Sequence, residues 1–402
     1  MSAALVLVLL GLSVFYCCLF YCCFYLTDAN GTNALVADLI AAGKLPDSHV
    51  PLRTVYTGIA PLDEILTSLV VFLWPVTDGN SPGLALHTIS FVGSVNATWA
   101  LLVLEGYRKG NARTIVAFPV LFALLGQFLT FAFATSIYVA LHLLTISTAS
   151  SPTRTSLLVP KAVLHTLPVV TIIGFLIPAA ILLAPACSAS TQLVLAAWQL
   201  WPACASAVIF LAHTLFTHSS TSNAEDGIDI SSPSRTYIRS LRLVYAVTFL
   251  TTALPHFNSW TLPFLSYFAS AVLGPNTALG PVNLLEIHSL PIPVQTLAEG
   301  VHSFIAWDYL IASLAILVWA GSLHRGVYGC LGGAKGAALF ALTALVGPVA
   351  AAVVALWERE EVVFAAKRVM SMSMSLRKTR RRGGSGMGKW ERGGKVLVSA
   401  DW

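Results

Sequence analysis

Long, unbroken apolar runs recur along this chain, and they restrict the folds that it can adopt. In one of them, FIAWDYLIASLAILVWAG at residues 304–321, Asp308 is the one residue that carries a formal charge. The backbone groups of such runs are satisfied in lipid only by helices or closed barrels. The runs are continuous rather than alternating, which favours helices over a barrel.

The composition supports a membrane protein. Hydrophobic residues make up 56% of the 402 residues and charged residues only 10%, with a mean hydropathy of +0.77. A soluble domain carries about 25% charged residues. The formal net charge of +5 comes largely from the tail, where RKTRRR occupies residues 377–382. The core is nearly neutral, so the charge does not indicate a nucleic-acid partner.

The apolar runs predict an all-α, polytopic membrane bundle with about eight or nine transmembrane helices. The candidate spans are 3–26, 59–76, 86–105, 114–146, 165–186, 192–216, 240–256, 300–323 and 335–357. The short run 259–273 contains Pro263, and we expect it to be re-entrant or interfacial. The bundle is expected to occupy residues 1–357, followed by a basic, disordered cytosolic tail over 358–402.

Two basic segments predict the orientation. By the positive-inside rule, the tail and YRKGNAR at residues 107–113 are expected on the cytosolic side. Arg108, Lys109 and Arg113 are then expected to lie at the membrane surface rather than to bind a diphosphate. The glycosylation sequon at Asn30 argues for the opposite orientation. We expect a multi-pass protein of the endoplasmic reticulum.

Ionisable residues inside apolar runs are the candidates for chemistry, because they are costly to insert into a membrane. The candidate catalytic acids are Asp308, Asp63 and Glu105. Removal from water disfavours the charged form, so a buried carboxyl can stay protonated and act as a general acid. Each also has a structural alternative. Asp63 can complement a helix dipole, Glu105 can pair with a basic residue three or four positions later, and Asp308 can form an interhelical hydrogen bond.

Helical spacing places aromatic rings beside these acids. Asp63, Thr67, Val70 and Trp74 share one helix face, and Phe304, Asp308, Ile311, Ala315 and Trp319 share another. A water-poor pocket with an acid and aromatic faces is what a cationic cyclisation needs, because aromatic faces stabilise cations. The candidate substrate-binding residues are Trp74, Asp78, His87, His302 and Trp307.

Other enzyme classes lack their motifs. A prenyltransferase or a diphosphate-dependent synthase would show paired aspartates that hold Mg²⁺, and no predicted span offers two aspartates four residues apart. Neither GxSxG nor HExxH occurs in the chain. We therefore predict no metal site and no cofactor.

Three stretches resemble the fungal membrane-bound terpene cyclases of the ascofuranone type. They are YTGIAPLDEILTSLVVFLWPVTDGNSPGLAL (56–86), LEGYRKGNAR (104–113) and FIAWDYLIASLAILVWA (304–320), and the resemblance covers roughly residues 50–325. It implies a metal-independent enzyme that cyclises a farnesyl chain, often epoxidised and attached to a phenolic or hydroquinone head, by protonation. The implied partners are a hydrophobic isoprenoid substrate and the lipid bilayer, and the oligomeric state stays open. The alternative is a multi-pass transporter or a lipid-binding protein.

Overall fold

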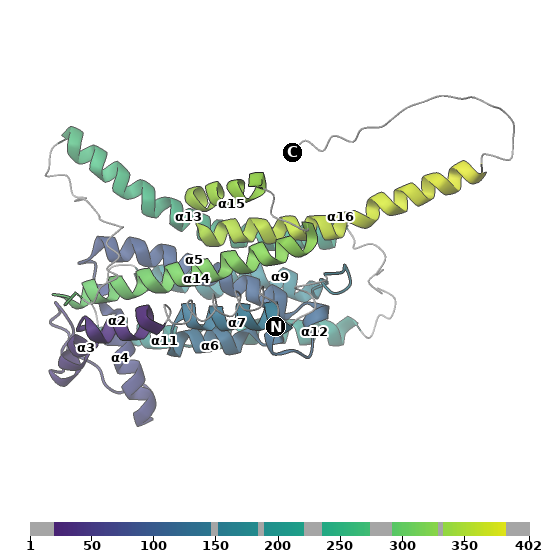
Figure 1. The fold of residues 1–402 in the computed structure, drawn as a ribbon. Helices are drawn as coiled ribbons and strands as arrows, with labels where there is room; N and C mark the ends of the chain where they lie inside the picture. The colour runs from purple at the N-terminus through teal and green to yellow at the C-terminus, as the bar shows by residue number, and fades with distance from the viewer. Residues whose placement is uncertain are drawn as a thin grey trace, which may run out of the picture.

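A computed structural model describes residues 20–145, 152–183, 189–220, 235–273, 292–328 and 333–382. Within these ranges every regular element is a helix, and the β-type pairing is limited to an isolated bridge between Lys44 and Pro51. The long helices lie side by side in a bundle, as Figure 1 shows. The predicted all-α class is confirmed for the described part of the chain.

The first third of the chain forms two long helices preceded by short ones. The elements are η1 (Tyr21–Tyr25), α2 (Leu26–Ala29), α3 (Thr32–Ala41), α4 (Ala60–Thr77) and α5 (Pro82–Gly106). Both long helices have proline in their first turn, where its missing N–H costs no intrahelical bond. The sequon residue Asn30 is buried, and its side-chain oxygen accepts hydrogen bonds from the Thr32 backbone and hydroxyl. An accessible glycosylation site is not compatible with that arrangement.

The remaining elements build the rest of the bundle. They are η2 (Lys109–Asn111), η3 (Ile115–Ala117), α6 (Pro119–Phe128), α7 (Phe131–Thr145), α9 (Lys161–Val169), η4 (Val170–Leu176), α10 (Ile177–Leu183), α11 (Ala189–Trp198), α12 (Trp201–Ser220), α13 (Arg235–Leu273), α14 (Leu297–Tyr328), α15 (Gly333–Val346) and α16 (Pro348–Arg382).

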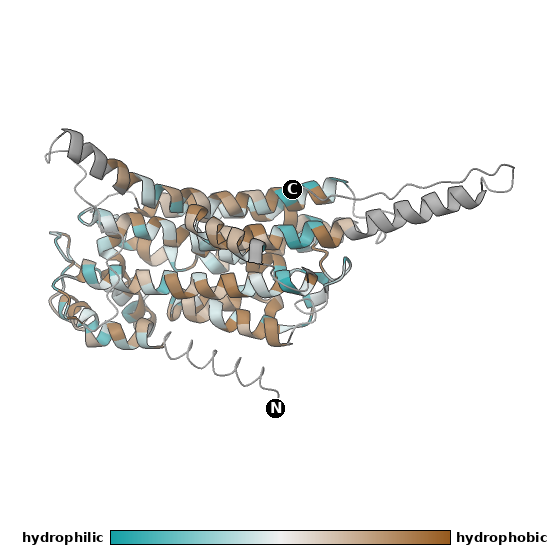
Figure 2. Ribbon diagram, turned by 45° about the horizontal axis from the view of Figure 1, so that its top comes forward, coloured by the Kyte–Doolittle hydropathy of each residue, from teal (hydrophilic) through white to brown (hydrophobic). Residues whose placement is uncertain are grey.

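Fewer helices than predicted are long and apolar enough to cross a membrane. Among the described residues there are four, namely Ala60–Thr77, Pro82–Gly106, Lys161–Leu183 and Leu297–Val327. A pair bent by 54°, Ser190–Trp198 with Trp201–Phe216, makes a fifth if it is one span. Apolar residues prevail along the long helices, while hydrophilic ones gather in the loops and near helix ends (Figure 2). Residues 3–19 of the expected first span, 3–26, lie outside the described residues.

Two expected spans have different boundaries in the structure. The run 114–146 is divided into α6 and α7 at Leu129 and Thr130, because the first N–H groups of α7 bind a side chain from α14. The run 259–273 is not a separate re-entrant piece, since α13 passes through it without a break. Pro263 removes one helical hydrogen bond, and the helix continues through it.

The core of the bundle includes part of the expected tail. Phe364 on α16, within the expected tail, is buried in the same apolar cluster as Trp319 on α14 and Leu101 on α5. Helix α16 continues past residue 357, and Arg359 and Glu360 are only 0% and 1% exposed. The bundle therefore extends beyond the expected boundary, because these two charged residues pair with partners on and next to α5.

Candidate functional site

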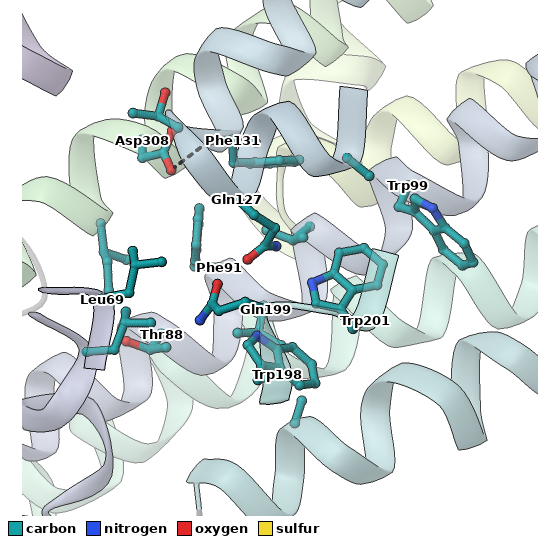
Figure 3. A pocket seen from close by; sticks show the side chains of 18 of the residues that line it. Leu69, Thr88, Phe91, Trp99, Gln127, Phe131, Trp198, Gln199, Trp201 and Asp308 are labelled. Carbon is teal, nitrogen blue, oxygen red and sulfur yellow. Dashed lines mark hydrogen bonds between the residues drawn. The ribbon is translucent and has the colours of Figure 1, made fainter. Parts of the chain in front are cut away.

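A cavity of about 210 Å³ lies inside the bundle. It is bounded by α4, α5, α6, α7, α11, α12 and α14 and by the helix that α9, η4 and α10 form. Nine aromatic side chains line it: Phe72, Phe91, Trp99, Phe122, Phe131, Phe175, Trp198, Trp201 and Phe304. Figure 3 shows how several of these rings surround the space.

The rings pack edge to face, so they hold one another in place. The Phe175 and Trp201 centroids are 4.5 Å apart with an interplanar angle of 87°, and Phe91 and Phe131 are 5.8 Å apart at 82°. Such pairs add about 0.5–1.5 kcal/mol beyond the burial of apolar area. The cavity thus has a defined shape, and its walls present π-electron density that can stabilise a cation.

Asp308 brings a carboxyl group to this cavity. Among the described residues that line it, no other is an Asp, Glu, Lys, Arg or His. The Asp308 side chain is 2% exposed. Its Oδ1 accepts a hydrogen bond from the Ala132 N–H at 2.6 Å. Its Oδ2 accepts one from the Phe131 N–H at 3.2 Å, which Figure 3 marks as a dashed line.

The position of Asp308 has two opposing electrostatic effects. Burial away from water favours the protonated acid. The first N–H groups of α7 carry the positive end of the helix dipole and favour the carboxylate. A group in this position can release a proton into the cavity and leave a carboxylate that is already hydrogen-bonded. The predicted structural role, an interhelical hydrogen bond, is present at the same time.

Two amide side chains add polarity to the cavity. Gln127 on α6 and Gln199, between α11 and α12, both line it, and Figure 3 shows their amide groups directed inward. The Gln199 Nε2 donates to the Leu195 carbonyl at 3.2 Å. The sequence analysis did not predict Gln199 as a site residue. The available signal was an amide in the otherwise apolar string AAWQLW.

Asp63 does not line the cavity. Its carboxylate accepts hydrogen bonds from the N–H groups of Tyr56, Thr57 and Gly58, at 3.1, 2.7 and 3.0 Å, and from the Thr57 hydroxyl at 2.9 Å. Asp63 therefore holds the loop before α4. The predicted shared face is confirmed, because Asp63, Thr67, Val70 and Trp74 are all buried.

Glu105 also lies away from the cavity, in a buried ion-pair network. Its Oε2 is 2.8 Å from the Arg108 Nε, and its Oε1 is 3.2 Å from the Arg359 Nη1. Arg108 also pairs with Glu360, and the Tyr245 hydroxyl donates to Glu360. The alternative prediction of a Glu105–Arg108 pair is confirmed. The expectation that Arg108 lies at the membrane surface is wrong, because two carboxylates draw it inside.

None of the predicted substrate-binding residues lines the cavity. Trp74 is fully buried in the packing between helices, and Asp78 follows the last residue of α4, where it accepts a hydrogen bond from the Asn80 N–H. Burial raises the pKa of Asp78. Neither residue lines the cavity.

The two predicted histidines contact each other. The His87 Nδ1 and the His302 Nε2 are 3.1 Å apart, which joins α5 to α14. Trp307 packs against a small buried cluster that contains Cys22 and Ala132. Of the predicted catalytic and substrate-binding residues, Asp308 is therefore the one that the structure places on the cavity wall. No group of three or more His, Cys, Asp or Glu side chains suited to a metal ion occurs among the described residues.

Comparison with known proteins identifies the family of the chain. The chain matches the CtvD domain over residues 3–364. The chain belongs to the CtvD domain family. It is 30% identical to terpene cyclase ctvD of Aspergillus terreus over 72% of this chain and 80% of that protein. It is 27% identical to terpene cyclase ascI of Acremonium egyptiacum over 83% of this chain and 86% of that protein. It is 29% identical to terpene cyclase penA of Penicillium crustosum over 75% of this chain and 80% of that protein.

The predicted resemblance to fungal terpene cyclases is confirmed by these matches. No solved structure matches the chain. All residues that line the cavity lie inside the matched CtvD domain, and so do Asp63 and Glu105. The cavity therefore belongs to the part of the chain that defines the family.

Proposed function

We propose that this protein is a membrane-bound terpene cyclase of fungal meroterpenoid or sesquiterpenoid metabolism. It cyclises a farnesyl chain in the aromatic cavity without a metal ion, and Asp308 supplies the first proton. The observation that carries this proposal is that one cavity is lined both by Asp308 and by nine aromatic rings. The names of the related proteins support the same class of reaction.

The protonated Asp308 donates its proton to an epoxide oxygen or to a terminal alkene carbon of the chain. With an epoxide, the oxygen takes the proton, one of its two C–O bonds breaks to leave a carbocation, and the oxygen stays on the product as a hydroxyl group. With an alkene, the π-electron pair forms the new C–H bond. In both cases the cation is attacked by the next double bond, which forms the ring bond.

The final cation loses a proton from a neighbouring carbon, and the Asp308 carboxylate recovers it. The product is then an isomer of the substrate, and the enzyme returns to its starting state. The N–H groups of Phe131 and Ala132 stabilise the carboxylate between these two steps. The apolar walls keep water away from the cation.

The other predicted acids fit this role less well. The carboxylate of Asp63 accepts four hydrogen bonds in the loop before α4, and Glu105 is compensated by arginines. Neither faces the cavity, so we assign the initiation to Asp308.

The test is turnover in isolated membranes. The protein is produced in yeast, and endoplasmic-reticulum microsomes are supplied with a farnesylated phenol and with its epoxide. We expect a product of unchanged mass with a new retention time, which is absent from microsomes without the protein. Microsomes that accumulate the substrate without converting either compound would instead favour the transporter or lipid-binding alternative.

A further inference from the structure

A second hollow lies on the outside of the bundle. It is a groove of about 1210 Å³ between the last turn of α5, the loop that leads into α6, and α12. Its walls are mainly apolar and include Val103, Val120, Leu158 and Phe210. The Phe210 side chain is 58% exposed. A groove with such walls accommodates an apolar chain from the surrounding lipid.

The rim of the groove is basic. Lys109 and Arg113 both line it and are exposed, and no Asp or Glu is found among its described lining residues. Arg108 also lines the groove, but its charge is neutralised by its buried partners Glu105 and Glu360. The charge at the rim is therefore positive and complements an anionic group.

The loop that carries the two basic residues is held in place. The Lys109 N–H donates to the Leu158 carbonyl at 2.9 Å, and the Gly110 N–H donates to the Ser156 carbonyl at 2.9 Å. Arg113 has a φ of 69°, a left-handed conformation that is unusual for arginine. Such conformations persist only where the surrounding structure enforces them, and they are found preferentially at functional sites.

The groove adjoins the aromatic cavity. On α5, Val103 lines the groove and Leu102 lines the cavity. On α6, Pro119 lines the groove and Phe122 lines the cavity. On α12, Ala203 lines the groove and Trp201 lines the cavity. The two spaces thus share three helices as a common wall.

We infer that the groove is the lateral entrance for the substrate, and that Lys109 and Arg113 bind an ionised acidic head group on the prenylated molecule. This inference rests on the proposed cyclase function. The head, a carboxylate or an acidic phenol, stays at the rim while the apolar chain lies along the groove toward Phe122 and Trp201. Trp99 lies roughly 10 Å along α5 from Gly106, within reach of three isoprene units.

The head-group part of the inference is tested by kinetics on two matched substrates. Microsomes carrying the Lys109→Ala/Arg113→Ala variant are supplied with a farnesylated hydroxybenzoic acid and with its neutral methyl ester. We expect KM for the acid to rise on the order of tenfold with kcat unchanged, because each basic residue near a membrane surface contributes to anion binding. KM for the ester should not change. The matched control is Arg239→Ala/Arg325→Ala, which removes two exposed positive charges outside the groove.

The entrance part is tested by filling the groove. Ala207 lines it, and Ala207→Trp is expected to lower kcat/KM for both the acid and the ester. The matched control is Val208→Trp, since Val208 is the next residue on α12, is 49% exposed and lines neither space. Unchanged kinetics in both the charge variant and Ala207→Trp would overturn the inference.

A binding measurement separates this inference from the cyclase proposal. A farnesylated hydroxybenzoic acid with a diazirine on its chain is photolysed in the microsomes, and labelled peptides are identified by mass spectrometry. Labelling of peptides from 103–120 and 203–213 that decreases in Lys109→Ala/Arg113→Ala supports the site, even if no isomer is formed. Labelling elsewhere overturns it. Displacement of the probe by phosphatidic acid, but not by unlabelled prenylated acid, also overturns it, because the groove would then be a lipid site.

Discussion

The Oδ1 of Asp308 on α14 and the backbone N–H of Ala132 in the first turn of α7 are 2.6 Å apart. This hydrogen bond joins two residues separated by 176 positions in the sequence. It satisfies one of the N–H groups that a helix start leaves without an intrahelical partner. The same bond places the acid at the cavity wall, so the start of α7 and the candidate proton donor are positioned together.

Replacing Asp308 tests the proton donor. Asp308→Asn keeps the size of the side chain and can still accept from Ala132, but it has no acidic proton. General acid catalysis contributes typically 10²–10⁴-fold, so turnover should fall by about that factor. The measurement is product formation per amount of folded protein, with Asp38→Asn on the exposed face of α3 as the control. Turnover close to that of the wild type would limit Asp308 to its structural role.

Removing a ring from the cavity should change both rate and product. Phe91→Leu takes away one aromatic face that lines the cavity and that packs against Phe131. A cation–π contact contributes about 0.5–2 kcal/mol, so the rate should fall roughly 2- to 30-fold. We also expect products in which water has captured a cation, detected as masses heavier by one water. Phe340→Leu, on the exposed surface of α15, should leave the rate and the product pattern unchanged.

Glu105→Gln should impair folding rather than chemistry. The change removes the buried carboxylate that pairs with both Arg108 and Arg359, and breaking a buried ion pair costs about 3–5 kcal/mol. The yield of folded protein and its thermal stability in detergent should drop. The turnover rate per folded molecule should stay unchanged. The exposed pair of Glu361 and Arg242 provides the control, since Glu361→Gln should cost at most about 1 kcal/mol. A stable Glu105→Gln protein without turnover would place Glu105 in the reaction.

Asp63→Asn should loosen the loop before α4. The amide oxygen can replace only part of the four hydrogen bonds that the carboxylate accepts. Bonds to charged groups contribute about 1.5–3 kcal/mol, so we expect a destabilisation of about that size. Limited proteolysis near residues 53–58 should become faster, while Glu64→Gln, the exposed neighbour, should behave like the wild type. A loss of turnover with normal proteolysis would contradict this structural assignment.

Chelation tests whether the reaction needs a metal. The proposed proton transfer uses only side chains and backbone groups, so activity in microsomes should survive EDTA. The measurement is the initial rate before and after dialysis against the chelator. A loss of activity that Mg²⁺ restores would move the protein to the diphosphate-dependent enzymes.

Local patterns in the sequence predicted the features that depend on neighbouring residues. The buried face of α4 follows from helical spacing, and the Glu105–Arg108 pair follows from a separation of three residues. The burial of Asp308 follows from the apolar run that contains it. These predictions succeeded because each depends on the helical repeat or on the apolar character of a single segment.

Contacts between distant segments could not be read from the sequence. The break between α6 and α7 depends on Asp308, which lies 177 residues after Phe131. The burial of Arg108 depends partly on Glu360, 252 residues later. No local pattern indicates either partner, so one helix was expected where there are two, and Arg108 was expected at the surface. The aromatic wall from α11 and α12 was missed for the same reason.

The ion-pair network also sets an order of events during synthesis. Glu105 and Arg108 emerge from the ribosome together, but Arg359 follows Glu105 by 254 residues. At a synthesis rate of roughly 5–20 residues per second, Arg359 emerges tens of seconds after Glu105. During this interval the nascent bundle buries an incomplete set of charges. We expect the arrival of α16 to complete insertion, so chains that end before Arg359 should be recognised and degraded by the quality control of the membrane.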